Sequence, residues 1–196
     1  MLLIKINVLG VKEGVGKTSV ALSLSRELAR FGKTLIVDKT PTCGLGRKMW
    51  ITDDMLCDGN LCMLKLFRKP FRIDSKDLER ASEKLKEVYS KGWDYVVIDN
   101  FSCAIPDNPI IKLDIDSLPI FVTDPLNLKV TLEYSDKFYS KFGLVINQVP
   151  EGYNISRKLE KLFQIVVSIP FIEESRFGGY LQSIVESIME RTTQFM

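Results

Sequence analysis

The sequence predicts one α/β domain with a mainly parallel sheet and helices on both faces. The chain has 196 residues, of which 45% are hydrophobic and 27% charged, as in ordinary globular proteins with a substantial core. Short apolar runs alternate with helical patterns along the whole chain. This alternation is typical of βαβ units, in which helices cover a parallel sheet. Because no repeat or linker interrupts it, we expect a single domain over residues 1–196.

Each predicted element follows from its own local pattern. Short apolar runs, mostly rich in β-branched residues, predict buried parallel strands at 2–9, 34–37, 95–98, 118–123, 144–146 and 165–169. Helical periodicity predicts helices near 17–31, 75–91, 127–140, 154–163 and 180–193. The segment 61–67 fits either a strand or a helical turn, and the region 39–75 is the least regular.

Composition excludes several classes of function. The chain contains no His, so His-based triads and His metal sites are excluded, and a net charge of +2 is too small by itself to indicate a nucleic-acid or membrane partner. The apolar start is interrupted by Lys5 and Asn7 and reads as a strand rather than a signal peptide. The four cysteines lack CxxC spacing, so we expect reduced thiols in a cytoplasmic protein. They are Cys43, Cys57, Cys62 and Cys103.

The stretch GVKEGVGKTS at 10–19 lies between the first strand and the first helix, where a phosphate-binding loop is expected. In such a loop the main-chain amides surround phosphate groups, and Gly is needed where φ is positive or the ligand approaches closely. Lys17 would neutralise phosphate charge, and Thr18 would ligate Mg²⁺. We therefore predict a nucleotide site formed by Lys12, Glu13, Gly14, Val15, Gly16, Lys17, Thr18 and Ser19.

KEGVGKTS resembles the deviant Walker A loop, KGGxGK[ST], of the ParA/MinD family of P-loop ATPases. The resemblance implies a three-layer P-loop NTPase fold that binds ATP or ADP with Mg²⁺. It also implies that Lys12 contacts the partner's nucleotide in an ATP-sandwiched dimer, although Lys12 also fits an ordinary surface lysine. The family tolerates a non-Gly residue at Val11, whereas Glu13 replaces a usual Gly and brings a carboxylate close to phosphate.

Two further motifs resemble the family's switch segments. KTLIVDKTPTCGLG at 33–46 matches switch I at Asp38 and Pro41, but Thr40 replaces the second Asp. The resemblance assigns Asp38 to the Mg²⁺ shell and to catalysis with Lys12 and Lys17. WDYVVIDNFSC at 93–103 resembles the Walker B segment, in which Asp99 would hold Mg²⁺ through water, while Phe101 and Ser102 replace two usual prolines.

The family's base-binding end is also represented. GLVINQV at 143–149 resembles the strand whose terminal Asn, here Asn147, reads the adenine, and an amide side chain suits a base edge. VSIPF at 167–171 resembles the last strand, with Pro170 in the Ile-Pro step beside the base. FVTDP at 121–125 resembles a strand ending in TxPE, with Leu126 in place of the Glu.

These resemblances imply an ATP- and Mg²⁺-dependent switch that forms a homodimer, hydrolyses ATP slowly and acts in DNA partitioning or positioning. Two alternatives stay open. Thr40, Phe101 and Ser102 suit a degenerate nucleotide sensor with little turnover, since phosphoryl transfer depends on positioned charge. A less favoured alternative is an ATP-dependent ligase resembling dethiobiotin synthetase, which shares the fold and a GVGKT-like loop.

Partners are predicted from the surface. The last helix places Leu181, Ile184, Val185, Ile188 and Met189 on one face without a lysine-rich stripe opposite, which favours core packing over a membrane anchor. An activating protein partner is compatible with the family. The basic cluster Lys65, Arg68, Lys69 and Arg72 is a candidate for non-specific DNA binding, and an ordinary surface loop explains it equally well.

Overall fold

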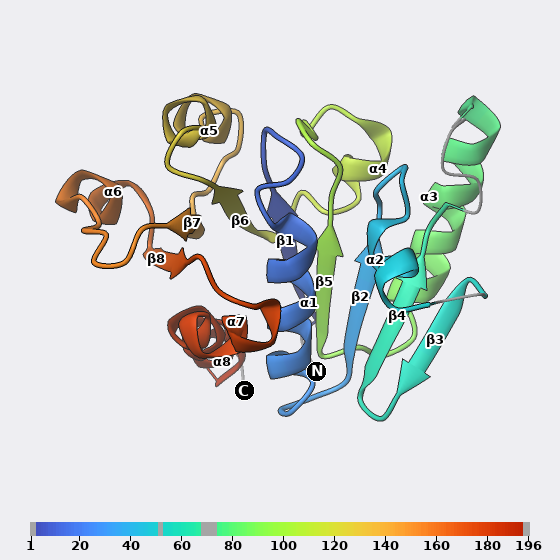
Figure 1. Ribbon diagram of the computed structural model, residues 1–196. Helices are drawn as coiled ribbons and strands as arrows, with labels where there is room; N and C mark the ends of the chain where they lie inside the picture. Colours follow the sequence, from blue (N-terminus) through green and yellow to red (C-terminus); the bar gives the residue numbers. More distant parts are fainter. Residues whose placement is uncertain (1–2, 51–52, 68–73, 194–196) are drawn as a thin grey trace.

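The computed structural model describes residues 3–50, 53–67 and 74–193. Within them, eight strands form one sheet in the order β3-β4-β2-β5-β1-β6-β7-β8 (Figure 1). All neighbouring strands are parallel except β3 and β4. The strands are β1 (Ile4–Leu9), β2 (Thr34–Asp38), β3 (Met55–Asp58), β4 (Leu61–Lys65), β5 (Tyr95–Asp99), β6 (Leu118–Thr123), β7 (Gly143–Val149) and β8 (Ile165–Pro170). The predicted fold class is confirmed.

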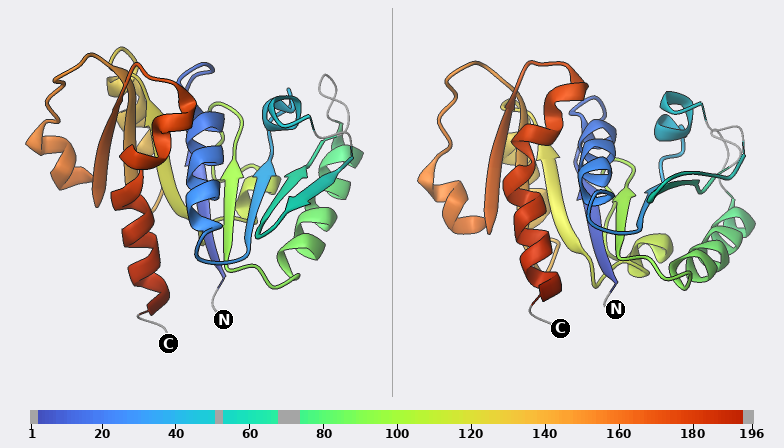
Figure 2. Two further views of the ribbon diagram at one scale, coloured as in Figure 1. Left: turned by 60° about the horizontal axis from the view of Figure 1, so that its bottom comes forward. Right: turned by 90° about the horizontal axis from the view of Figure 1, so that it is seen from below.

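Helices cover both faces of the sheet (Figures 1 and 2). One face carries α1 (Lys17–Leu28), α7 (Phe177–Tyr180) and α8 (Gln182–Thr193). The other carries α3 (Ser75–Tyr89), α4 (Pro109–Lys112), α5 (Leu128–Ser135) and α6 (Arg157–Leu162). Two short elements, α2 (Gly44–Lys48) and the 3₁₀ turn η1 (Glu174–Arg176), follow β2 and β8.

The central strands are buried on both faces, as a parallel sheet between two helical layers requires. Every residue of β2 and β5 is buried, so neither strand alternates between polar and apolar residues. The apolar face of the last helix packs into the core and confirms the predicted core role: Ile184, Val185 and Ile188 of α8, and Leu181 just before it, are at most 1% exposed. No helix among the described residues is long and apolar enough to cross a bilayer.

The described residues of the region 39–75 contain regular elements that its sequence did not indicate. The ambiguous segment 61–67 contains strand β4, which forms an antiparallel hairpin with β3. That register places Cys57 opposite Cys62, and the two form a disulfide, so the prediction of reduced thiols is wrong for this pair. Sequence spacing alone could not reveal the pairing, because it depends on the hairpin register. Cys43 and Cys103 are free, and cytoplasmic location stays a prediction.

The parallel arrangement collects the sequence motifs at one edge of the sheet. Asp38 and Asp99 end the neighbouring strands β2 and β5 and are directly paired in register. Strand β1 lies beside β5, so the loop that follows it begins next to Asp99. This edge, formed by the carboxyl ends of the strands, is where open α/β sheets bind ligands.

The basic cluster proposed for DNA is described only in part. Lys65 is the last residue of β4. Arg68, Lys69 and Arg72 lie outside the described residues. DNA binding by this cluster therefore stays a prediction.

Candidate functional site

The loop between β1 and α1 has the backbone of a phosphate-binding loop. Gly14 and Gly16 have φ of +81° and +97°, which side chains other than hydrogen rarely allow. A Cβ on Gly16 would lie 2.3 Å from Nδ2 of Asn147, so Gly is also required for space. Gly14 has open space around it, and its requirement is conformational.

Asn147 supports this loop from the end of strand β7. Its Nδ2 donates a hydrogen bond to the carbonyl of Val15 at 2.9 Å, and the side chain is buried. Its Oδ1 is buried without a hydrogen-bond partner among the described residues. The loop contact is a role that the sequence did not suggest, whereas adenine recognition by Asn147 stays a prediction.

The side chain of Lys17 lies against the loop, and two hydrogen bonds fix its ammonium group. Nζ donates to the carbonyl of Lys12 at 2.8 Å and to Oγ of Ser102 at 2.9 Å. Burial lowers the pKa of Lys17, and the nearby Asp99 carboxylate opposes part of this shift. Ser102 therefore contacts the lysine predicted to bind phosphate, a role that was not predicted for it.

Thr18 and Asp99 form the pair expected for a magnesium site. The Thr18 hydroxyl donates to Oδ2 of Asp99 at 2.7 Å. Asp99 is fully buried, and its Oδ1 has no hydrogen-bond partner among the described residues. Burial raises the pKa of Asp99 to about 7, a shift that the Thr18 bond partly opposes and Asp38 increases. A hydroxyl and a carboxylate fit Mg²⁺, which takes its remaining oxygens from phosphates and water.

Asp38 organises the chain that follows it. Its Oδ1 accepts from the backbone N–H of Thr40 at 2.9 Å and from the Thr40 hydroxyl at 2.5 Å. Its Oδ2 accepts from the N–H groups of Leu45 and Gly46 at 2.9 Å and 3.2 Å. Both oxygens therefore hold the turn and the start of α2, while a role in the Mg²⁺ shell or in catalysis stays a prediction.

Thr40 stands where the switch I motif that this segment resembles has its second Asp. Besides donating to Asp38, its hydroxyl accepts from the backbone N–H of Gly44 at 3.1 Å. Thr40 therefore contributes to the same turn as Asp38. Its oxygen also borders the cavity described next.

Two cavities adjoin at the loop between β1 and α1, residues 10–17, which we call the phosphate loop. The first, of about 340 Å³, is lined by the loop, by the segment after β2 and by the segment after β5. The second, of about 270 Å³, is lined by residues that include Asn147, Pro170 and Phe171. Gly14, Gly16 and Ser19 line both. An elongated ligand with an anionic end would fit this pair, with its other end beside Asn147 and Pro170.

The two charged residues before the glycines are exposed. The side chain of Lys12 makes no hydrogen bond or ion pair within the described part of the chain, although its carbonyl accepts from Lys17. Glu13 borders the first cavity and adds negative charge near Lys17. The cross-dimer role of Lys12 stays a prediction.

A buried ion pair was not predicted. It involves the segment 38–48 after β2, which we call the switch segment. Lys39, between Asp38 and Thr40, is fully buried and pairs with Asp114. Its Nζ also donates to the carbonyl of Ile110 at 2.6 Å, and the Tyr89 hydroxyl donates to Asp114 at 2.9 Å. No local pattern indicates this pair, because the partners are 75 residues apart.

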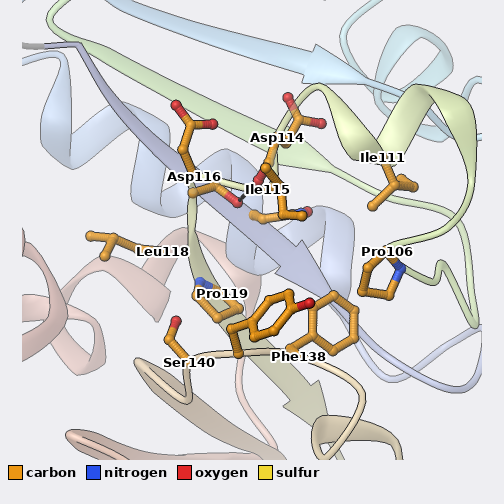
Figure 3. A pocket seen from close by; sticks show the side chains of 12 residues that line it. Pro106, Ile111, Asp114, Ile115, Asp116, Leu118, Pro119, Phe138 and Ser140 are labelled. Atoms are coloured by element: carbon orange, nitrogen blue, oxygen red, sulfur yellow. Dashed lines mark hydrogen bonds between the residues drawn. The ribbon is translucent and has the colours of Figure 1, made fainter.

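A third cavity, of about 290 Å³, shares no lining residue with the other two and has mostly apolar walls (Figure 3). Its walls include Ile111, Leu118 and Phe138. Asn7 also lines it and accepts a hydrogen bond from Asn100, which borders the first cavity. This contact connects the third cavity to a residue that lines the first.

Comparison with known proteins identifies the fold. No protein-family model and no curated protein matches the sequence. The structure is similar to a plasmid partition protein from Borrelia burgdorferi bound to AMPPNP, with 17% identity, 100% of both chains covered and a TM-score of 0.64. It is also similar to the MinC:MinD cell division protein complex from Aquifex aeolicus, with 18% identity, 97% of this chain and 96% of that chain covered and a TM-score of 0.62.

A third similar structure is the septum site-determining protein MinD from Pyrococcus horikoshii complexed with Mg-ADP. It has 19% identity, 86% of this chain and 82% of that chain covered, and a TM-score of 0.57. At such identities the likeness concerns the fold. The chain has the fold of the ParA/MinD P-loop ATPases.

Proposed function

We propose that this protein is an ATP- and Mg²⁺-dependent switch of the ParA/MinD type, which forms a homodimer when ATP is bound. The observation that carries the proposal is the arrangement of three groups beside the first cavity. Lys17 and Thr18 line the cavity, and the Thr18 hydroxyl donates to the buried carboxylate of Asp99. Similar folds bound to AMPPNP and to Mg-ADP support a nucleotide as the ligand.

The loop amides and Lys17 would bind the phosphates. Because Lys17 Nζ is held by a main-chain carbonyl and by Ser102, it is oriented before any ligand arrives. A phosphate oxygen would take the place of the Ser102 hydroxyl as its partner. Thr18 and Asp99 would hold Mg²⁺, which would supply positive charge to the phosphates.

The first test is calorimetry with ATP and ADP in the presence of Mg²⁺. We expect binding by the wild type and its loss in Lys17→Ala, because the loop would keep its shape but lose its buried cation. Lys33→Ala, which removes an exposed lysine after α1, is the matched control and should bind as the wild type does. Full binding by Lys17→Ala would overturn the site.

Dimer formation is tested separately through Lys12. Its exposed side chain is available to reach a second copy. We expect light scattering to detect a dimer with ATP and Mg²⁺ but not with ADP. Lys12→Ala should stay monomeric yet bind ATP with near-normal affinity, and a Lys12→Ala dimer of normal stability would refute the role of this residue.

A nucleotide sensor with little turnover is the second candidate. It is favoured by Thr40, whose hydroxyl is engaged by Asp38 and Gly44. Among the described residues that line the first cavity, Glu13 is the only acid. Measurable phosphate release from ATP and Mg²⁺ supports the switch, whereas binding without release supports the sensor. A rate increase in Thr40→Asp would show that this position limits turnover.

A further inference from the structure

Three side chains from separate elements meet beside the phosphate loop. Ser19 lies in the first turn of α1, Lys48 is the last residue of α2, and Glu174 is the first residue of η1. The Ser19 hydroxyl donates to Oε2 of Glu174 at 2.5 Å, and Lys48 Nζ donates to Ser19 Oγ at 3.1 Å. Lys48 and Glu174 also form an ion pair. We call this group the Glu174 contact.

The Glu174 contact lies where the two loop cavities join. Ser19 lines both cavities, and Glu174 lines the second. A ligand that occupies both cavities must therefore pass Ser19. The first turn of a helix attracts anions through its free N–H groups and its dipole. In this structure the anion beside that turn is a carboxylate of the protein itself.

Glu174 is held in its charged form. Burial by itself would raise its pKa, but the hydrogen bonds from Lys48 and Ser19 and the positive charge of Lys48 together oppose burial, and the pKa of Glu174 is lowered. Arg26 adds a further positive charge nearby. A phosphate group placed at Ser19 would meet this negative charge and compete for the same donors.

We propose that Glu174 is a built-in competitor of the nucleotide, which occupies the Ser19 end of the phosphate site until the nucleotide displaces it and takes over Lys48. The inference rests on the proposed nucleotide-binding function and adds a residue that sets its affinity. A triphosphate prevails because it also engages the loop amides and Lys17, which Glu174 does not contact.

Displacement of Glu174 also affects the switch segment. Lys48 and Asp38 hold opposite ends of α2, since Asp38 accepts from the N–H groups of Leu45 and Gly46 at its start. When the nucleotide takes over Lys48, the link between α2 and η1 breaks. Nucleotide entry therefore changes what holds α2 next to the phosphate site.

The test compares nucleotide affinities of charge-neutralising variants. Glu174→Gln keeps the size of the side chain but removes its charge. We expect it to bind Mg-ADP about threefold to tenfold more tightly than the wild type, the range of a partly exposed charge interaction. The matched control is Glu173→Gln, which removes the same charge from the neighbouring exposed residue. Its affinity should stay within about twofold of the wild type.

Equal or weaker binding by Glu174→Gln would overturn the inference; weaker binding would mean that the carboxylate helps to hold the nucleotide. Equal tightening by Glu173→Gln would also overturn it, because the effect would then be one of net charge. These results differ from failure of the proposed function, in which no folded variant, wild type included, binds nucleotide. That result would remove both proposals together.

Discussion

The phosphate loop at 10–17 and the switch segment at 38–48 lie side by side at one sheet edge, yet they are held in different ways. The loop takes its shape from glycine backbone angles and from hydrogen bonds that the side-chain amides of Asn147 and Gln148 donate to its carbonyls. The switch segment takes its shape from buried charges, with Asp38 at the turn and Lys39 paired with Asp114. The glycine positions that shape the loop can be read directly from the sequence, whereas the switch segment also depends on a buried charge pair whose partner lies 75 residues away.

Removing the buried cation of the switch segment should have the largest effect. Lys39→Met leaves Asp114 buried without its partner, which should lower the free energy of unfolding by about 3–5 kcal/mol. Urea denaturation measures this change. Arg30→Met, which removes an ion pair whose Arg side chain is 71% exposed, should lower it by less than about 1 kcal/mol.

The double variant Lys39→Met/Asp114→Asn sharpens the result. It removes both charges, and the Asn oxygen can still accept from Tyr89. We expect it to be more stable than Lys39→Met alone. If both variants are equally destabilised, packing rather than the unpaired charge holds the segment.

Asp99 borders both regions, and its titration should make stability depend on pH. Its pKa is about 7 in the folded protein against an ordinary 3.8, so the folded state binds the proton more tightly than the unfolded chain. This stabilisation is complete below about pH 4 and is lost as the pH rises through about 7.

In Asp99→Asn that contribution disappears. Without nucleotide or Mg²⁺, wild-type stability relative to Asp99→Asn should therefore fall by up to about 4 kcal/mol between pH 4 and pH 8. Thermal unfolding across this range measures it. The exposed Asp107→Asn serves as the control and should follow the wild-type pH profile. If the difference in stability between the wild type and Asp99→Asn does not change with pH, burial does not raise the pKa of the Asp99 carboxyl group.

The smallest expected change in stability comes from the loop, although the change in function should be complete. Gly16→Ala forces a side chain into a φ of +97° and against Asn147, which should lower stability by about 1–3 kcal/mol and abolish nucleotide binding. Gly152→Ala has a φ of +77° with open space around it, so it carries the strain without the clash and should keep binding. Normal binding by Gly16→Ala would contradict the loop geometry.

The sequence predicted those parts that local patterns determine. The six parallel strands other than β4 and the glycine turn before α1 were predictable, because burial on both faces and glycine spacing leave a direct pattern, whereas β3 was missed and β4 was ambiguous. Lys39, Ser102 and Glu174 were not, since each acts through a partner brought near by the sheet order. Several helices are shorter than predicted, such as α5 at Leu128–Ser135 against 127–140, because periodic residues continue beyond the last helical turn.

The Cys57–Cys62 disulfide has a consequence for how copies of this protein can associate. It links β3, the strand at one edge of the sheet, to β4, and β3 has four residues and ends in Asp58. A short edge strand that is disulfide-linked to its neighbour and carries a charge is a poor template for adding a strand from another chain. Association by growth of the sheet should therefore be disfavoured on this side, and β8 is the other edge strand of the described sheet.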